Sequence, residues 1–344
     1  MRYLPAAGST DLCVSYVPPI QEARMLNPLG STHPLRPIFV IGAERSGTTM
    51  LGSMIGAHSD VLCLPESNFI AVHMPTSDPK RPVDSRHILK MFRSHYKFRT
   101  MWRGVRVDDA SLASDTSITF PGLVDWLVEQ YAISVNKTSV TSWLDHAPNN
   151  LLYVHRLNQH FPNSKFVHII RDGRAFANSM IAADWGPNDV IDAAERWVYF
   201  VGLGMIAMNY LGEGRIMMVK YEDVVTKPEE SMQGIARFLE LDFQPGMCSP
   251  TGLSVPGFIK KTHALLGASV EPKRLDAWKQ KLKPRDIEIL ESKIGDLLLI
   301  LGYQRITDLD VAPASDNEYY LRKTLSVSKS IRNKLAHFKR YYSN

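Results

Sequence analysis

The sequence of 344 residues contains little cysteine and no long apolar run. Its three cysteines, Cys13, Cys63 and Cys248, are widely separated and odd in number, so they form neither a disulfide framework nor a zinc-binding spacing. The longest dense apolar run, Leu297 to Leu301, is far shorter than the roughly 20 residues that cross a bilayer. No apolar stretch of signal-peptide length follows the first residues. These absences predict a soluble, cytoplasmic protein.

Acidic residues are missing from the last part of the chain. After Leu321 the sequence holds seven lysines and arginines and no aspartate or glutamate. Because the whole chain has a formal net charge of +5, the body before this tail is close to neutral, which argues against a general nucleic-acid-binding protein. Apolar residues recur in the tail at roughly helical spacing. We therefore expect an amphipathic helix that lies on an anionic membrane, docks to a partner or packs on its own domain. A homodimer is a further expectation.

Short apolar runs alternate with helical patterns between the irregular arm at residues 1–36 and the basic amphipathic tail at 311–344. The expected strands are 38–41, 61–64, 165–170 and 215–219, and the expected helices are 49–57, 120–135, 149–161, 175–183, 190–211, 228–239 and 284–301. This alternation predicts one α/β domain over 37–310, a three-layer P-loop-like fold with a mainly parallel central sheet flanked by helices. Ligands of such sheets bind beyond the carboxyl ends of the strands.

The turn after the first expected strand has the frame of a phosphate-binding loop. Gly42 to Thr49 reads G-A-E-R-S-G-T-T and fits the pattern G-x-x-x-x-G-K-[ST], except that Thr48 replaces the lysine. Glycines let backbone N–H groups converge on an anion, and the helix that begins near Thr48 adds its positive end. Lysine and Mg²⁺ act on the β- and γ-phosphates of nucleoside triphosphates, so the missing lysine predicts a ligand without a γ-phosphate or metal. Arg45 can supply a permanent, fork-shaped cation for a sulfate-bearing phosphate.

A second strand-to-helix turn reads R-D-G at 171–173, and Ser179 follows eight residues after Arg171. These two residues could grip one phosphate, while Asp172 is also a plausible helix N-cap. Together the two turns resemble those of sulfotransferases that use 3′-phosphoadenosine 5′-phosphosulfate (PAPS), most nearly the tyrosylprotein sulfotransferases and related bacterial enzymes. The resemblance is close over 37–67 and 149–181 and looser over 221–303.

The resemblance implies an enzyme that moves the sulfuryl group of PAPS to a hydroxyl acceptor and releases 3′-phosphoadenosine 5′-phosphate (PAP). The transfer would be an in-line displacement with a general base and no metal, and the acceptor a carbohydrate, lipid, small metabolite or peptide tyrosine. The phosphate loop would hold the 5′-phosphosulfate, Arg171 and Ser179 the 3′-phosphate, and Tyr221 the adenine. Two cations before Trp278 would replace the Arg-Lys-Gly run of cytosolic members. The implied donor-binding residues are Arg45, Ser46, Gly47, Thr48, Thr49, Arg171, Ser179, Tyr221, Lys273 and Arg274.

Two residues compete for the role of general base. Glu66, in L-P-E-S, has the spacing from the loop arginine that the catalytic glutamate has in tyrosylprotein sulfotransferases. His146, in D-H-A-P, matches the histidine base of cytosolic members, where tyrosylprotein enzymes carry a lysine that assists the leaving group. We expect Glu66 to be the base, His146 to contact the leaving group or the acceptor, and Arg45 to stabilise the transferring group; the reverse assignment of Glu66 and His146 stays open.

Two other classes of protein remain as alternatives. A degenerate P-loop kinase or nucleotide hydrolase is disfavoured by Thr48 at the lysine position. A nucleotide-binding protein without sulfuryl transfer is disfavoured by the presence of both Glu66 and His146. The acceptor itself is not encoded in any motif, and its binding walls are expected from 70–118 and 182–192, where the chain leaves the shared pattern.

Overall fold

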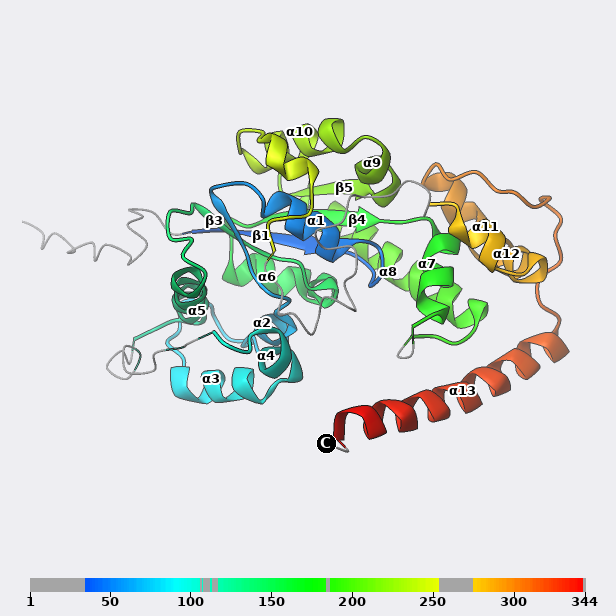
Figure 1. The fold of residues 1–344 in the computed structure, drawn as a ribbon, viewed down its shortest axis with the longest axis horizontal. Coiled ribbons are helices and arrows are strands. Elements are labelled where there is room, and N and C mark those ends of the chain that lie inside the picture. The colour runs from blue at the N-terminus through cyan, green and yellow to red at the C-terminus, as the bar shows by residue number, and fades with distance from the viewer. Residues whose placement is uncertain are drawn as a thin grey trace, which may run out of the picture.

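The computed structural model describes residues 35–105, 107, 112, 117–183, 186–253 and 275–342, with side chains as far as 329. Its centre is a sheet of five parallel strands in the order β2-β3-β1-β4-β5 (Figure 1). The strands are β1 (Arg36–Ile41), β2 (Val61–Cys63), β3 (Ser142–Asp145), β4 (Lys165–Ile170) and β5 (Ile216–Lys220). In β1 and β4 every residue after the first is buried, as expected where helices cover both faces of a parallel sheet.

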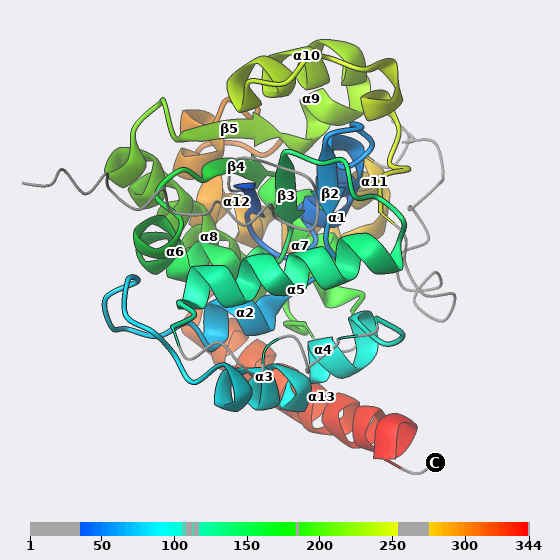
Figure 2. The same cartoon turned by 90° about the vertical axis from the view of Figure 1, so that its left-hand side faces the viewer.

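Helices cover the two faces and bury a separate apolar cluster on each. One face carries α1 (Thr48–Ile55), α9 (Tyr221–Thr226) and α10 (Pro228–Leu239), and the alternate β1 residues Ile38 and Val40 point into this cluster. Phe39 and Ile41 point to the other face. The helices that contribute to that second cluster are α2 (Asn68–Val72), α3 (Ser85–Ser94), α4 (Tyr96–Met101), α5 (Phe120–Ser134), α6 (Val154–His160), α7 (Gly173–Ile181), α8 (Val190–Leu211) and α12 (Pro284–Ile300). The predicted three-layer fold is confirmed (Figures 1 and 2).

Several elements differ from the sequence-based expectations. The helix expected over 149–161 is a 3-10 turn, η2 (Pro148–Tyr153), followed by α6. The short strand β3 was not predicted. The helices α3 and α4 within 70–118 were not predicted either, and their buried residues join the apolar cluster on the second face of the sheet. Three shorter elements, η3 (Pro245–Cys248), α9 and α11 (Ala277–Lys281), were also missed. Each is six residues or fewer, which is too short to show a clear period in the sequence.

The basic tail forms one long helix, α13 (Asp316–Tyr342), whose first turns are held by ion pairs. Arg322 contacts Asp189 at 3.0 Å and Asp286 at 2.8 Å, and Lys323 contacts Asp192 at 2.5 Å. These acids lie at the start of α8 and of α12, so the first part of α13 packs on the main domain. Contact of the tail with a membrane or partner stays a prediction. Within the described ranges, no helix is long and apolar enough to cross a membrane.

Candidate active site

The carboxyl ends of all five parallel strands meet at one edge of the sheet, and the predicted site residues that the structure describes lie there. The phosphate loop follows β1, Glu66 follows β2, and His146 follows β3. Arg171 follows β4 and Tyr221 follows β5. Lys273 and Arg274 lie outside the described residues. The edge therefore collects chemical groups from segments far apart in the sequence, as the parallel topology requires.

The phosphate loop is curled by two residues with positive φ. Arg45 has φ 64° and Gly47 has φ 102°, and Gly47 is the N-cap of α1. No side chain caps this helix, so the first amides of α1 are left for another acceptor. A Cβ added to Gly47 would lie 2.6 Å from Cδ2 of Tyr221, so the loop and the tyrosine ring are in close contact. This local geometry fits an anion-binding loop.

The two predicted arginines lie together. Arg171 Nη1 donates to the backbone oxygen of Arg45 at 2.9 Å, and Arg45 Nε donates to Ser179 Oγ at 3.1 Å. Burial, followed by the charge of Arg171, lowers the pKa of Arg45. Two neighbouring cations repel each other unless an anion lies between or beside them. Ser179 and the backbone of the loop add hydrogen-bonding groups to the same place.

Tyr221 completes this group from the other side. Its ring is 5% exposed, and the Arg171 guanidinium lies 4.5 Å from the ring centroid. The next residue, Glu222, accepts the backbone N–H of Asp172 at 3.0 Å and the hydroxyl of Tyr303 at 2.8 Å. These bonds fix α9 against the turn after β4. The Tyr221 ring and the Arg171 guanidinium are therefore held in contact with each other.

Glu66 lies beside a lysine that sequence reasoning missed. Lys97 Nζ in α4 is 2.7 Å from Glu66 Oε2, and the two side chains are only 18% and 12% exposed. Thirty residues with no clear motif separate them in the sequence, so only the fold brings them together. The charge of Glu66 also contributes to raising the pKa of Asp145 at the end of β3, where burial is the main cause. Hydrogen bonds from Asn150, among others, oppose that rise.

His146 is fully buried and lies against α1. A Cβ added to Gly52 would be 2.7 Å from the Cβ of His146, so the histidine needs a glycine at this position of the helix. Backbone placement at the end of β3 puts His146 next to Asp145 and near the start of η2. Its side chain is less accessible to an acceptor than that of Glu66.

Two further features near the second turn are structural. Arg174, which follows the R-D-G turn, pairs with Asp172 at 2.6 Å and with the buried Glu291 of α12 at 2.5 Å. Trp278 covers the same guanidinium, with 4.2 Å between the group and the ring centroid. Arg174 therefore ties α7 to α11 and α12, and its cation is neutralised by protein carboxylates. Asp172 also accepts the N–H of Arg174, as predicted for a helix N-cap.

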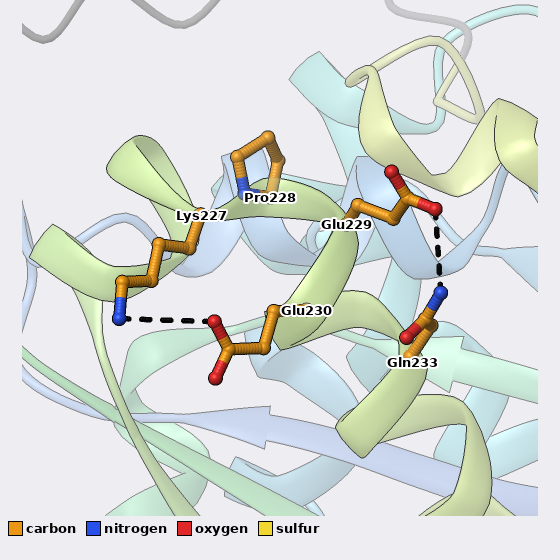
Figure 3. Close-up of a pocket in the computed structure, with 5 residues that line it drawn as sticks. All are labelled: Lys227, Pro228, Glu229, Glu230 and Gln233. Carbon is orange, nitrogen blue, oxygen red and sulfur yellow. Dashed lines mark hydrogen bonds and ion pairs between the residues drawn. The ribbon is translucent and has the colours of Figure 1, made fainter.

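A hollow on the surface lies away from these groups. It is lined by Lys227, Pro228, Glu229, Glu230 and Gln233 at the start of α10 (Figure 3). The lining side chains contact one another, with Lys227 3.7 Å from Glu230 and Gln233 3.3 Å from Glu229. The hollow gathers no groups from the strand ends, so it is not part of the candidate active site.

A family model described as "Sulfotransferase family" matches residues 37–245, and the chain belongs to this family. Among curated relatives, a protein-tyrosine sulfotransferase of Drosophila melanogaster is 24% identical over 76% of this chain and 47% of its own length. The chain thus spans about half of that relative. Protein-tyrosine sulfotransferase 2 of Gallus gallus is 25% identical over 77% of this chain and 69% of its own length. A putative protein-tyrosine sulfotransferase of Caenorhabditis briggsae is 24% identical over 82% and 95%.

Solved structures show the same fold. The sulfotransferase domain of the Synechococcus PCC 7002 olefin synthase has a TM-score of 0.52, 21% identity, and coverage of 79% of this chain and 97% of that one. The sulfotransferase domain from the curacin biosynthetic pathway has a TM-score of 0.50, 17% identity, and coverage of 78% and 98%. At these identities the likeness concerns the fold alone.

The comparisons confirm the predicted family and enzyme class, a sulfotransferase rather than a degenerate kinase. They also correct one prediction. The expectation of a cytoplasmic protein was wrong, because the relatives are protein-tyrosine sulfotransferases and not the cytosolic sulfotransferases. The absence of a signal-like segment had led to that expectation. The roles of individual site residues stay predictions.

Proposed function

We propose that this chain transfers the sulfuryl group of PAPS to a hydroxyl acceptor at the carboxyl edge of its sheet. One observation carries the proposal: Arg45, Arg171 and Ser179, from two different strand-to-helix turns, are linked by direct hydrogen bonds. A nucleotide phosphorylated on both sides of its ribose needs two neighbouring anion sites. The family membership of the chain supports PAPS as the sulfuryl donor.

The donor would be held by the backbone and side chains of the phosphate loop and by the second turn. The uncapped amides of α1, with Ser46, Thr48 and Thr49, would bind the 5′-phosphosulfate. Arg171 and Ser179 would bind the 3′-phosphate. Tyr221, whose ring lies under the Arg171 guanidinium, would contact the adenine. Lys273 or Arg274 would add a second cation near the 3′-phosphate.

In the transfer itself, Glu66 would accept the proton of the acceptor hydroxyl as its oxygen attacks sulfur. Arg45 would stabilise negative charge on the transferring group, and PAP would leave in line with the attacking oxygen. His146 would contact the leaving group or acceptor from the end of β3. Glu66 is preferred as base because its carboxylate retains some exposure and is held by a cation, whereas His146 is fully buried behind α1.

Among the acceptors, we favour a peptide tyrosine. The curated relatives are named as protein-tyrosine sulfotransferases and match across most of this chain. Segments 70–118 and 182–192, where the sequence leaves the pattern of the family, would supply the acceptor walls. Carbohydrate, lipid and small-metabolite hydroxyls are the competing acceptors.

Two experiments test the proposal. Calorimetry should show binding of PAP and no comparable binding of ATP–Mg²⁺; the opposite result would restore the kinase alternative. A ³⁵S-labelled PAPS assay over tyrosine peptides, phenols, sugars and lipids should show transfer to the peptides first. Glu66→Ala and His146→Ala should both retain PAP binding and lose turnover. If Glu66→Ala keeps near-normal kcat while His146→Ala is inactive, His146 is the base.

A further inference from the structure

The predicted base, Glu66, forms an ion pair with a lysine, and neither residue belongs to the proposed donor cradle, which consists of the phosphate loop, Arg171, Ser179 and Tyr221. Lys97 Nζ lies 2.7 Å from Glu66 Oε2, with both side chains less than one-fifth exposed. Charges removed from water are costly unless the pair has good geometry, and a lysine also loses side-chain entropy when it is held. We propose that Lys97 is a positioning residue for Glu66: by binding Oε2 it turns the other carboxylate oxygen toward the acceptor. This inference rests on the proposed function of Glu66 as base.

The ion pair with Lys97 uses only one of the two carboxylate oxygens of Glu66. Lys97 binds Oε2, whereas Oε1 accepts no hydrogen bond from any residue in the described ranges. An ionised carboxylate only accepts hydrogen bonds, so Oε1 is left to accept from the acceptor hydroxyl.

Lys97 is held in place by the segments on both sides of Glu66. His95 is the N-cap of α4, and its Nδ1 accepts the backbone N–H of Lys97 at 3.2 Å. At the other end of α4, Trp102 Nε1 donates to the backbone oxygen of Pro65 at 3.2 Å. Phe69 of α2 packs against the Trp102 ring at 5.5 Å between centroids. The helix that carries Lys97 is thus fixed to the residue before Glu66 and to the helix after it, which orients the ammonium before any acceptor binds.

Lys97 is chemically unchanged in the proposed reaction. The acceptor O–H proton moves to Glu66 Oε1 while the acceptor oxygen forms a bond to sulfur. The bond between sulfur and the 5′-phosphate oxygen breaks, and PAP leaves with that electron pair. Lys97 keeps its three protons throughout and acts only through the carboxylate. Its loss should therefore reduce turnover, leave PAP binding intact, and matter only while residue 66 is an acid.

A double-mutant cycle tests this reasoning. The variants are Lys97→Met, Lys97→Arg, Glu66→Gln and the double variant Glu66→Gln with Lys97→Met, assayed by ³⁵S transfer from PAPS to a tyrosine peptide and to 2-naphthol. Lys97→Met should lower kcat by about tenfold or more, and Lys97→Arg should restore most of it. In the Glu66→Gln background, Lys97→Met should add less than about a twofold loss, because the two residues act as a unit.

A readout without an acceptor accompanies the assay. Lys97→Met should lower the midpoint of thermal unfolding by about 3 °C, and adding Glu66→Gln should recover much of it, because a neutral amide needs no cation. Lys165→Met is the matched control: it also removes a partly buried lysine from an ion pair, with Glu240, but at the start of β4, the opposite end of that strand from the candidate active site. It should leave kcat unchanged.

The outcomes separate the two hypotheses. Full activity of Glu66→Gln would refute the proposed base, and the inference about Lys97 with it. Loss of activity in Glu66→Gln together with normal kcat in Lys97→Met would overturn the lysine inference alone. A loss from Lys97→Met that is equally large in both backgrounds would also overturn it, since the lysine would then act independently of Glu66. Weaker PAP binding in Lys97→Met would place the lysine in the donor site instead.

Discussion

The substitution Gly47→Ala tests the contact on which the donor cradle depends. Gly47 has φ 102°, a conformation that costs an L-residue about 1–3 kcal/mol. Its added Cβ would lie 2.6 Å from Cδ2 and 3.0 Å from Cε2 of Tyr221. The tyrosine ring is 5% exposed and carries the Arg171 guanidinium on its face, so it cannot move without disturbing the second turn.

The overlap adds about 1–3 kcal/mol of overpacking strain to the backbone cost. Part of this strain lowers the stability of the folded protein. The rest weakens ligand binding, because a bound ligand requires the curled conformation of the loop. If about 2 kcal/mol falls on binding, the Kd for PAP should rise by about 30-fold. The remainder should lower the midpoint of thermal unfolding by about 4 °C or more.

Isothermal titration calorimetry with PAP, together with differential scanning calorimetry, measures both effects. The control is Gly202→Ala on α8, where an added Cβ meets nothing within 4 Å. Because alanine favours a helix over glycine, this control should bind PAP normally and gain about 0.5–1 kcal/mol of stability. If Gly47→Ala bound PAP as tightly as the unchanged protein, the donor would not use the curled loop, and our reading of the cradle would be refuted.

Four other substitutions have defined outcomes. Arg45→Ala or Arg171→Ala should weaken PAP binding about 10- to 100-fold in calorimetry, because each removes a charge-assisted contact; unchanged affinity for both would move the donor elsewhere. Gly204→Ala should cost about 3 kcal/mol in denaturant unfolding, since its Cβ would lie 1.9 Å from Cε1 of the buried His168. Burial lowers the pKa of His168 to about 4, so the folded state keeps the ring neutral while the unfolded chain takes up a proton near pH 6.5. The free energy of unfolding should therefore be unaffected by His168 above pH 6.5 and should decrease by about 3 kcal/mol as the pH drops to 4. The substitution His168→Leu should remove that decrease from the dependence of stability on pH.

The parts of the fold that were predicted from sequence are those with a long or strongly apolar pattern. The strand at 165–170 and the helices at 190–211 and 228–239 have the predicted limits. In contrast, β3 has four residues, of which Ser142 and Asp145 are polar although both are buried. Neither the alternation of an exposed strand nor the continuous apolar run of a buried one is present there. Tertiary pairing with β1 on one side and with β2 on the other forms this strand, and local preference does not.

The same difference explains which site residues could be found. The proposed donor cradle is encoded locally: each turn places an arginine and a glycine within a few residues of a strand end, and a hydroxyl follows in the loop or in the next helix, so the sequence alone indicates its chemistry. The acceptor side is assembled from segments with no such frame. Lys97 reaches Glu66 only because Trp102 and Phe69 lock α4 against the chain around residue 66. The motifs therefore predict the donor, whereas Lys97, which we propose to position the base, is placed by aromatic packing in a segment whose sequence has no recognisable period. We accordingly expect the residues that select the acceptor to lie in α2 to α4 and not in the phosphate loop.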